Sequence, residues 1–329
     1  MSGQPLSCGL PDPVPTTSLT PVHPVTEPHT SGRLAVGDGH ELHWQIHGNP
    51  TGKPVVVLHG GPGAGLRIRA TRLLDPAVYR VVLFDQRGCG RSTPHAGEPE
   101  VDLSTNTTDH LVADLELLRA SLDVERWLVL GASWGAVLGL VYAQRFPERV
   151  TGLVLAGVAT GRRVETDLLT RGLGEVFPEA WREFSDFVGA PEGDLSAAYL
   201  ERLVDPDPLV HLAAADAWCA WEEAVLPQTP GSLADKVGRD RLAFARLVAH
   251  YWAHGSWLRE NEVLDGCDRL AGVPGVVVQG ELDLINLVGT PWLLDRAWTA
   301  GELVVVRETA HGGSAAMSEA WKAAADSFR

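Results

Sequence analysis

The pentapeptide at 131–135, Gly-Ala-Ser-Trp-Gly, restricts the possible folds of this chain more than any other segment does. An apolar run at 127–130 precedes it and a helix-like run at 136–143 follows it. Such a sharp passage from strand to helix needs small residues around the serine, because a side chain at Gly131 or Gly135 would collide with neighbouring backbone. The pattern therefore predicts a serine exposed at the end of a strand, where its hydroxyl can act as a nucleophile.

Short, continuous apolar and β-branched runs recur along the chain, which is typical of strands covered on both faces. Helical patterns separate them; one begins near Thr108 and Asp109 and places leucines at 111, 115, 118 and 122 on one face. This alternation predicts an α/β fold with a mostly parallel, doubly wound sheet. The expected strands lie at 41–46, 54–58, 80–84, 127–130, 150–155, 276–278 and 303–306.

Residues 160–268 interrupt the alternation with helical stretches, for example at 208–226 and 240–252, and with no convincing strand. We interpret 160–268 as a helical cap inserted between two parts of one α/β core, at 31–159 and 269–329. Residues 1–30 are rich in Pro, Ser and Thr, which predicts a disordered or loosely packed amino-terminal arm.

The composition narrows the possible partners. The 329 residues include 42 acidic and 27 basic side chains, a net charge of −15, which argues against binding to nucleic acid or an anionic membrane. No apolar run is long enough to span a bilayer, and the amino terminus lacks the pattern of a secretory signal. The four scattered cysteines show no metal-ligand spacing and favour reduced thiols in the cytoplasm. We expect no metal and no cofactor, and the sequence leaves the oligomeric state open.

A serine nucleophile needs a histidine base, and the base needs a carboxylate to orient it. Asp283 follows the expected strand at 276–278, and His311 follows the expected strand at 303–306. We therefore predict a triad of Ser133, Asp283 and His311. Glu281 is the alternative candidate for the carboxylate. In that case Asp283 would serve only to form a turn. His311 is the only histidine after His254.

Backbone amides must meet the negative charge that develops on the attacked carbonyl oxygen. We expect one amide from Trp134, which follows the nucleophile, and one from the glycine-rich loop at 59–63, His-Gly-Gly-Pro-Gly. Within this loop we favour the Gly61 amide, the alternative being a plain Gly-Pro turn. The loop does not have the pattern of a phosphate-binding loop.

Together these motifs resemble the proline iminopeptidase (prolyl aminopeptidase) family of serine peptidases. The resemblance implies an α/β-hydrolase fold with a helical cap. It also implies release of an N-terminal prolyl or other aminoacyl residue from a small peptide or aminoacyl compound, through an acyl-enzyme on Ser133 and without a metal. The motifs that carry it lie at 36–40, 48–50, 52–54, 59–63, 85–92, 102–108, 131–135 and 217–222.

The resemblance also implies a substrate-binding set. Family members bind the free ammonium of the substrate through acidic residues of the cap, and Glu222 matches one of them. Trp218 and Trp221 belong to the same cap segment, and His59 and Gly60 to the glycine-rich loop. The alternative is a purely structural role, in which Glu222 only presents a charge to solvent from a cap helix or pairs with a nearby base.

Two recognition positions depart from the family pattern. A second glutamate is expected just before the aromatic triplet at 250–252, where the matching residue is Val248, and an arginine is expected where this chain has Ala156. The pattern therefore indicates an intact triad within a reshaped pocket. The alternatives are a family member that hydrolyses a specialised small-molecule amide or ester, for example in secondary metabolism, and a non-catalytic binding protein on the same scaffold.

Overall fold

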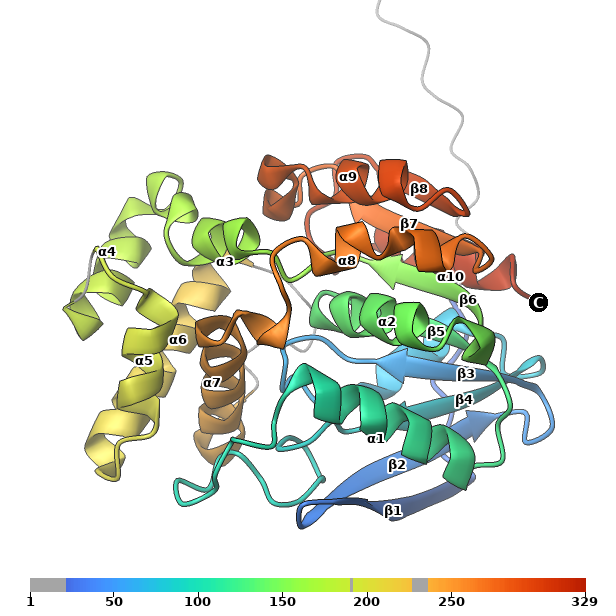
Figure 1. Cartoon of the computed structure of the whole chain (residues 1–329), viewed down its shortest axis with the longest axis horizontal. Helices are drawn as coiled ribbons and strands as arrows, with labels where there is room; N and C mark the ends of the chain where they lie inside the picture. The colour runs from blue at the N-terminus through green and yellow to red at the C-terminus, as the bar shows by residue number, and fades with distance from the viewer. Residues whose placement is uncertain (1–21, 190–191, 227–235) are drawn as a thin grey trace, which may run out of the picture.

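The computed structural model describes residues 22–189, 192–226 and 236–329. An 8-stranded sheet with the order β1-β2-β4-β3-β5-β6-β7-β8 forms its centre (Figure 1). Strands β1, β2 and β4 pair antiparallel, and the pairs from β4 through β3 to β8 are parallel. The strands are β1 (Thr30–Gly37), β2 (His40–Gly48), β3 (Lys53–Leu58), β4 (Tyr79–Phe84), β5 (Trp127–Ala132), β6 (Val150–Ala156), β7 (Gly275–Gly280) and β8 (Gly301–Val306).

Helices cover both faces of the sheet, so the predicted doubly wound α/β fold is confirmed. The α-helices of the described residues are α1 (Thr108–Ser121), α2 (Trp134–Arg145), α3 (Arg163–Thr170), α4 (Pro178–Val188), α5 (Leu195–Leu203), α6 (Pro208–Val225), α7 (Gly238–Ala253), α8 (Glu262–Asp265), α9 (Thr290–Ala297) and α10 (Ala315–Asp326). The 3₁₀ helices are η1 (Ile68–Leu73), η2 (Pro147–Arg149), η3 (Gly172–Glu175), η5 (Gly255–Trp257), η6 (Cys267–Leu270) and η7 (Leu284–Val288).

Strand β1 is the one strand that the sequence patterns missed. It lies at the edge of the sheet, pairs only with β2, and most of its side chains are exposed or half-buried. An edge strand therefore lacks the apolar run that identifies a strand covered on both faces. Helix α1 also begins as predicted, although its cap is Thr107, whose side chain accepts a hydrogen bond from the His110 amide.

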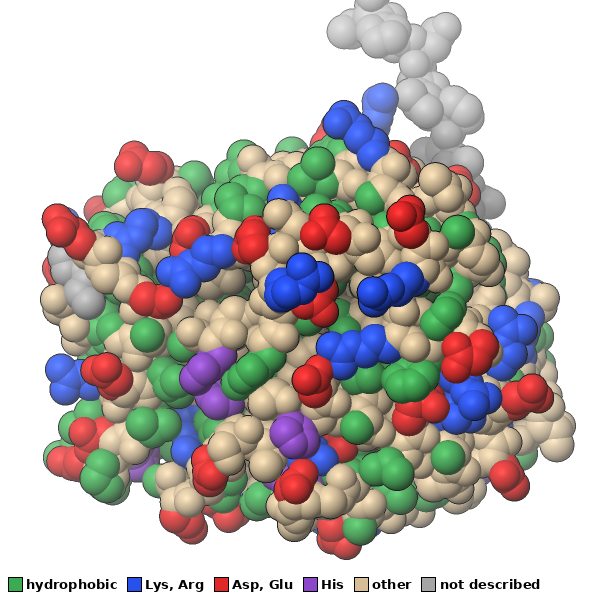
Figure 2. All heavy atoms as spheres, viewed as in Figure 1, with side chains coloured by type: hydrophobic (Ala, Val, Ile, Leu, Met, Phe, Trp, Pro, Cys, Tyr) green, Lys and Arg blue, Asp and Glu red, His purple; other side chains and the backbone are tan. Residues whose placement is uncertain are grey.

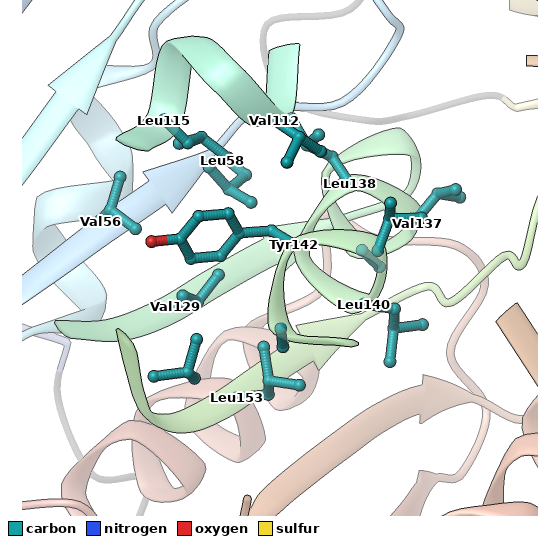
Figure 3. Packing of buried hydrophobic residues seen from close by; sticks show 14 of the residues in the cluster. Val56, Leu58, Val112, Leu115, Val129, Val137, Leu138, Leu140, Tyr142 and Leu153 are labelled. Atoms are coloured by element: carbon teal, nitrogen blue, oxygen red, sulfur yellow. The ribbon is translucent and has the colours of Figure 1, made fainter. Parts of the chain in front are cut away.

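The parallel strands alternate their side chains between two apolar layers. Val56 and Val129 face the layer that contains α1, α2 and α9, whereas Val55 and Leu128 face α10 and the segment after η1. Figure 3 shows the first layer, where Tyr142 of α2 lies among Val129 and its neighbours. Burial on both faces explains why these strands have continuous apolar sequences.

The turn between β5 and α2 has the tight packing that its glycines predicted. A Cβ atom at Gly131 would overlap the Gly135 carbonyl, and one at Gly135 would overlap the Leu58 carbonyl of β3. Ser133, between them, has φ 54° and ψ −121°, in the region that L-residues rarely adopt. The predicted collision is therefore confirmed, and the close approach of β3, β5 and α2 fixes the serine backbone.

Helices α3 to α7 lie between β6 and β7 in the chain and gather to one side of the sheet (Figure 1). They have a separate apolar cluster that includes Phe184, Trp218 and Val248. In contrast, Val263 and Leu270 pack with the sheet layer. We therefore propose that the cap ends near η5 rather than at 268.

Most of the expected amino-terminal arm, 1–21, lies outside the described residues. Residues 22–29 contact the core, since the His23 amide donates to the Arg72 carbonyl at 2.9 Å and the His29 amide to the Ile46 carbonyl at 3.0 Å. No helix in the described part of the chain combines the length and apolarity needed to cross a membrane. On the face in Figure 2, acidic and basic side chains are interspersed.

We expect Gly135→Ala to destabilise the protein by about 3 kcal/mol, because its Cβ would overlap the Leu58 carbonyl and backbone cannot move aside as a side chain can. Gly139→Ala, in the same helix, is the matched control. Its Cβ would meet Val129 Cγ1 at 3.4 Å, an ordinary contact. Urea denaturation measures both variants, and equal stabilities would contradict this account of the turn.

Candidate active site

The three predicted triad residues follow three different strands of the parallel part of the sheet. Ser133 lies between β5 and α2, Asp283 follows β7, and His311 follows β8. Because the carboxyl ends of parallel strands meet at one edge of a sheet, residues distant in the chain come together there.

His311 and Asp283 form a direct hydrogen bond, with Nδ1 of His311 2.8 Å from Oδ2 of Asp283. Asp283 is buried, and its Oδ1 accepts a hydrogen bond from the Ile285 amide at 3.2 Å. Burial would raise the pKa of Asp283. The charge and hydrogen bond of His311, together with the hydrogen bonds from the Ile285 amide and the Gln279 side chain, hold this pKa below its usual value. Asp283 is therefore ionised and orients the imidazole so that Nε2 is free for a proton.

The pKa of His311 is raised above its usual 6.5. Burial acts to lower this pKa, but the charge and hydrogen bond of Asp283 and the charge of Glu222 outweigh it. A histidine can both take and return a proton in catalysis, and this raised pKa makes the imidazole of His311 a stronger base.

A cavity of about 780 Å³ opens beside these residues. Seven of the predicted site residues line it, namely Ser133, His311, His59, Gly60, Gly61, Ala156 and Glu222. The rest of the wall includes residues of the cap, of β3 and β4, of η1 and of α10. The cavity is much larger than one aminoacyl group, so both sides of a cleaved bond can be accommodated.

The glycine-rich loop passes directly over the serine. A Cβ atom at Gly60 would lie 3.4 Å from Ser133 Cβ and 3.9 Å from its Oγ. Gly61 has φ +109°, which favours glycine. Trp134 is the first residue of α2, where helix amides lack an intrahelical acceptor. The amides of Gly61 and Trp134 thus remain our proposed oxyanion donors.

His59 supports the loop rather than presenting a charge to the cavity. Its Nε2 accepts from the Gln86 amide at 3.0 Å, which leaves Nδ1 to donate to the Gly60 carbonyl at 2.9 Å. Burial lowers the pKa of His59 to about 4, so the ring is neutral at physiological pH.

Gln86 was not singled out by the sequence patterns. Its side-chain amide donates to the His59 carbonyl at 3.0 Å and accepts from the Trp134 indole at 3.1 Å. It therefore links the glycine-rich loop to the residue after the serine. Its position directly after β4 was the available signal.

Glu222 extends from α6 toward the cavity, where Trp218 Nε1 donates to its Oε1 at 2.8 Å. Burial raises the pKa of Glu222 to about 7, opposed by the Trp218 hydrogen bond and the charge of His311. A carboxylate with so few polar partners has unused capacity for a ligand cation.

Three of the predicted substrate-binding residues are absent from the cavity wall. Trp218, Trp221 and Val248 are buried in the apolar cluster of the cap. The Trp221 indole donates to the Leu169 carbonyl at 2.9 Å, and Trp218 supports Glu222. Trp218 and Trp221 are close to Glu222 in the sequence, but successive residues of a helix point in different directions. The sequence therefore could not show which of them line the cavity and which support the residues that do.

Gln279, near the end of β7, is a second residue that the sequence patterns missed. Its Nε2 donates to Asp283 Oδ2 at 2.8 Å, and its Oε1 accepts from the Val158 amide at 2.9 Å. The side chain is completely buried. A glutamine within an otherwise apolar buried strand was the signal, since buried polar groups need partners. Gln279 thus joins β6, β7 and the orienting carboxylate.

We expect Gln279→Leu to slow acylation of Ser133 by a fluorophosphonate roughly tenfold, because Asp283 loses a hydrogen bond and the Val158 amide loses its acceptor. The pH midpoint of labelling should rise, since a less solvated Asp283 carboxylate attracts the His311 proton more strongly.

Gln144→Leu is the matched control for that experiment. Gln144 is also buried, but it donates to the Val263 carbonyl at 2.6 Å, in α8. A similar loss of labelling in both variants, with no change in pH midpoint, would reduce Gln279 to a general structural role.

No group of three or more His, Cys, Asp or Glu side chains among the described residues is arranged to bind a metal ion. The chemistry available at this site is that of a serine, an imidazole–carboxylate pair and backbone amides.

Comparison with known proteins agrees with this geometry. Residues 53–314 match the model of the alpha/beta hydrolase fold family. The chain is 50% identical over 314 residues to a probable proline iminopeptidase of Streptomyces coelicolor, covering 93% of this chain and 97% of that protein. It is 41% identical over 314 residues to a proline iminopeptidase of Xylella fastidiosa, covering 93% and 99%.

Solved structures support the same fold. A proline iminopeptidase of Mycobacterium smegmatis matches with a TM-score of 0.59 at 23% identity, covering 91% of this chain and 97% of that one. A proline iminopeptidase-related protein of Thermus thermophilus matches with a TM-score of 0.57 at 26% identity, covering 91% and 98%. From its sequence, its fold and the geometry of its site, this chain belongs to the proline iminopeptidase family of alpha/beta hydrolases.

Proposed function

We propose that this protein is a serine hydrolase that releases an N-terminal aminoacyl residue from a small peptide or aminoacyl compound. The observation that carries the proposal is the position of Glu222 beside His311 in the cavity that Ser133 also lines. A carboxylate next to a serine nucleophile suits a substrate whose reacting carbonyl lies close to a free ammonium.

In the first half of the reaction, Ser133 Oγ attacks the carbonyl carbon while His311 Nε2 takes the hydroxyl proton. The amides of Gly61 and Trp134 meet the negative charge on the carbonyl oxygen. The carbon–nitrogen bond then breaks, and His311 gives its proton to the leaving amine. In the second half, water attacks the acyl-enzyme with the same base, releasing the amino acid and restoring Ser133.

The identity of the preferred aminoacyl group is a separate proposal. We favour proline because of the family, although Ala156 replaces an expected arginine at the cavity wall. Val248 lies within the apolar cluster of the cap. Glu222 is the carboxylate of the cavity wall whose charge raises the pKa of His311. The second candidate is a retuned family member acting on another small-molecule amide or ester, which the large cavity would allow.

We also propose a cytoplasmic protein without nucleic-acid or membrane partners. Its support is the net charge of −15 and the buried, unpaired thiols of Cys89, Cys219 and Cys267.

A panel of aminoacyl-naphthylamides and simple acyl esters tests the function. We expect aminoacyl amides to be cleaved, with prolyl-naphthylamide the best substrate. Ser133→Ala should reduce turnover by several orders of magnitude and abolish fluorophosphonate labelling. Ester turnover without any aminoacyl turnover would favour the second candidate, and an unlabelled wild-type protein would refute a serine hydrolase.

Replacing Glu222 tests the ammonium site. Glu222→Gln keeps the shape but removes the charge, so kcat/KM for an aminoacyl amide should fall roughly 10- to 100-fold, the effect of losing a charge-assisted hydrogen bond. Turnover of an uncharged ester should hardly change. Glu223→Gln is the control, because Glu223 also lines the cavity but pairs with Arg241 at 3.0 Å. Equal losses on both substrates would remove the ammonium-binding role.

The pH dependence should differ between the two substrate classes. His311 must be neutral for either substrate. Because its pKa is raised, ester kcat/KM should fall as pH drops through a value above 6.5, with the slope expected for the uptake of one proton. An aminoacyl amide also needs ionised Glu222, whose pKa is about 7, so its kcat/KM should fall with two coupled protons. Glu222→Gln should restore a one-proton slope. Identical slopes in the wild type would contradict this division of roles.

A further inference from the structure

Part of the wall of the cavity that Ser133 lines is basic. Arg67, Arg69 and Arg72, in and just before η1, all line it. Helix α10, which packs beside η1, contributes Ser318, Glu319 and Trp321. Three arginines and one carboxylate, Glu319, therefore line this part of the cavity, in a protein whose net charge is −15.

Two of these arginines have N–H donors without an acceptor among the described residues. Arg72 Nε donates to the His23 carbonyl at 3.2 Å, which orients its guanidinium, and the described residues offer its terminal nitrogens no acceptor. Arg69 is exposed and has no hydrogen bond or ion pair with any described residue.

The basic wall and Glu222 act on different parts of the cavity. The charge that acts on the Glu222 carboxyl, after burial and the Trp218 hydrogen bond, is that of His311. Arg67 instead acts with Lys236 on His59, the first residue of the glycine-rich loop. Glu222 from the cap and the arginines of η1 thus line the same cavity as Ser133, and we call these two parts of its wall the acidic pole and the basic pole.

We propose that the arginines of η1 bind the free C-terminal carboxylate of a short peptide, so that the preferred substrates are zwitterionic peptides of a few residues. This inference rests on the proposed function and adds a binding site for the part of the peptide that leaves as the free amine. The acyl residue, anchored at Glu222, occupies the acidic pole, and the remainder of the peptide extends toward η1. Guanidinium groups suit this ligand because their paired donors match a carboxylate.

The test compares a dipeptide Xaa-Gly with its amide Xaa-Gly-NH₂, where Xaa is the aminoacyl group cleaved best from a naphthylamide. We expect the wild type to favour the free carboxylate about tenfold in kcat/KM, the effect of a hydrogen bond to a charged group. The double variant Arg69→Gln/Arg72→Gln should bring the ratio close to one while cleaving the naphthylamide at the wild-type rate. Added salt should also reduce the wild-type ratio.

Arg296→Gln is the matched control, because Arg296 is exposed on α9, away from the cavity wall. It should keep the tenfold ratio. Equal cleavage of acid and amide by the wild type, with the naphthylamide still hydrolysed, would overturn the carboxylate site but leave the proposed function intact. No cleavage of either dipeptide or of any aminoacyl-naphthylamide would instead refute the proposed function.

Discussion

The close approach of α2 to β3 is the constraint on which the rest of the site depends. Gly135 lies so near the Leu58 carbonyl that no side chain fits, and the same approach forces Ser133 into a backbone conformation of positive φ. That conformation is unfavourable alone and persists because strands and helices on both sides determine it. The glycine-rich loop directly follows β3, so the packing that strains the serine also places Gly60 against it.

Buried amides carry this rigidity from the sheet to the reacting groups. Gln86 joins the glycine-rich loop to Trp134, and Gln279 joins β6 to the Asp283 carboxylate. Gln86 follows β4 and Gln279 lies near the end of β7, and an apolar residue at either position would leave buried polar groups without a partner. Neutral amides suit these positions because they orient neighbouring groups without adding charges that would shift the pKa of His311.

Much of this arrangement was predictable from the sequence. Glycines flanking a serine, and single polar residues after apolar runs, are local signals. They identified the sheet, the turn at Ser133 and the His311–Asp283 pair that the structure joins. The direction of a cap side chain is not local, because it depends on how helices pack. Val248 and Trp221 therefore turned out to be buried in the cap cluster, and the arginines of η1 went unnoticed until the fold placed them along the cavity.

The half-buried Glu222 also links substrate charge to the catalytic base. With its pKa near 7, this carboxyl is partly protonated in the empty cavity, so its effect on His311 is incomplete. A bound ammonium would favour the ionised form of Glu222, because an opposite charge lowers the pKa of a carboxyl group. The positive charge of the ammonium and the new negative charge of Glu222 then largely cancel at His311. Binding of a charged substrate therefore changes the pKa of His311 little, whereas a fully exposed carboxylate would respond little to the ammonium.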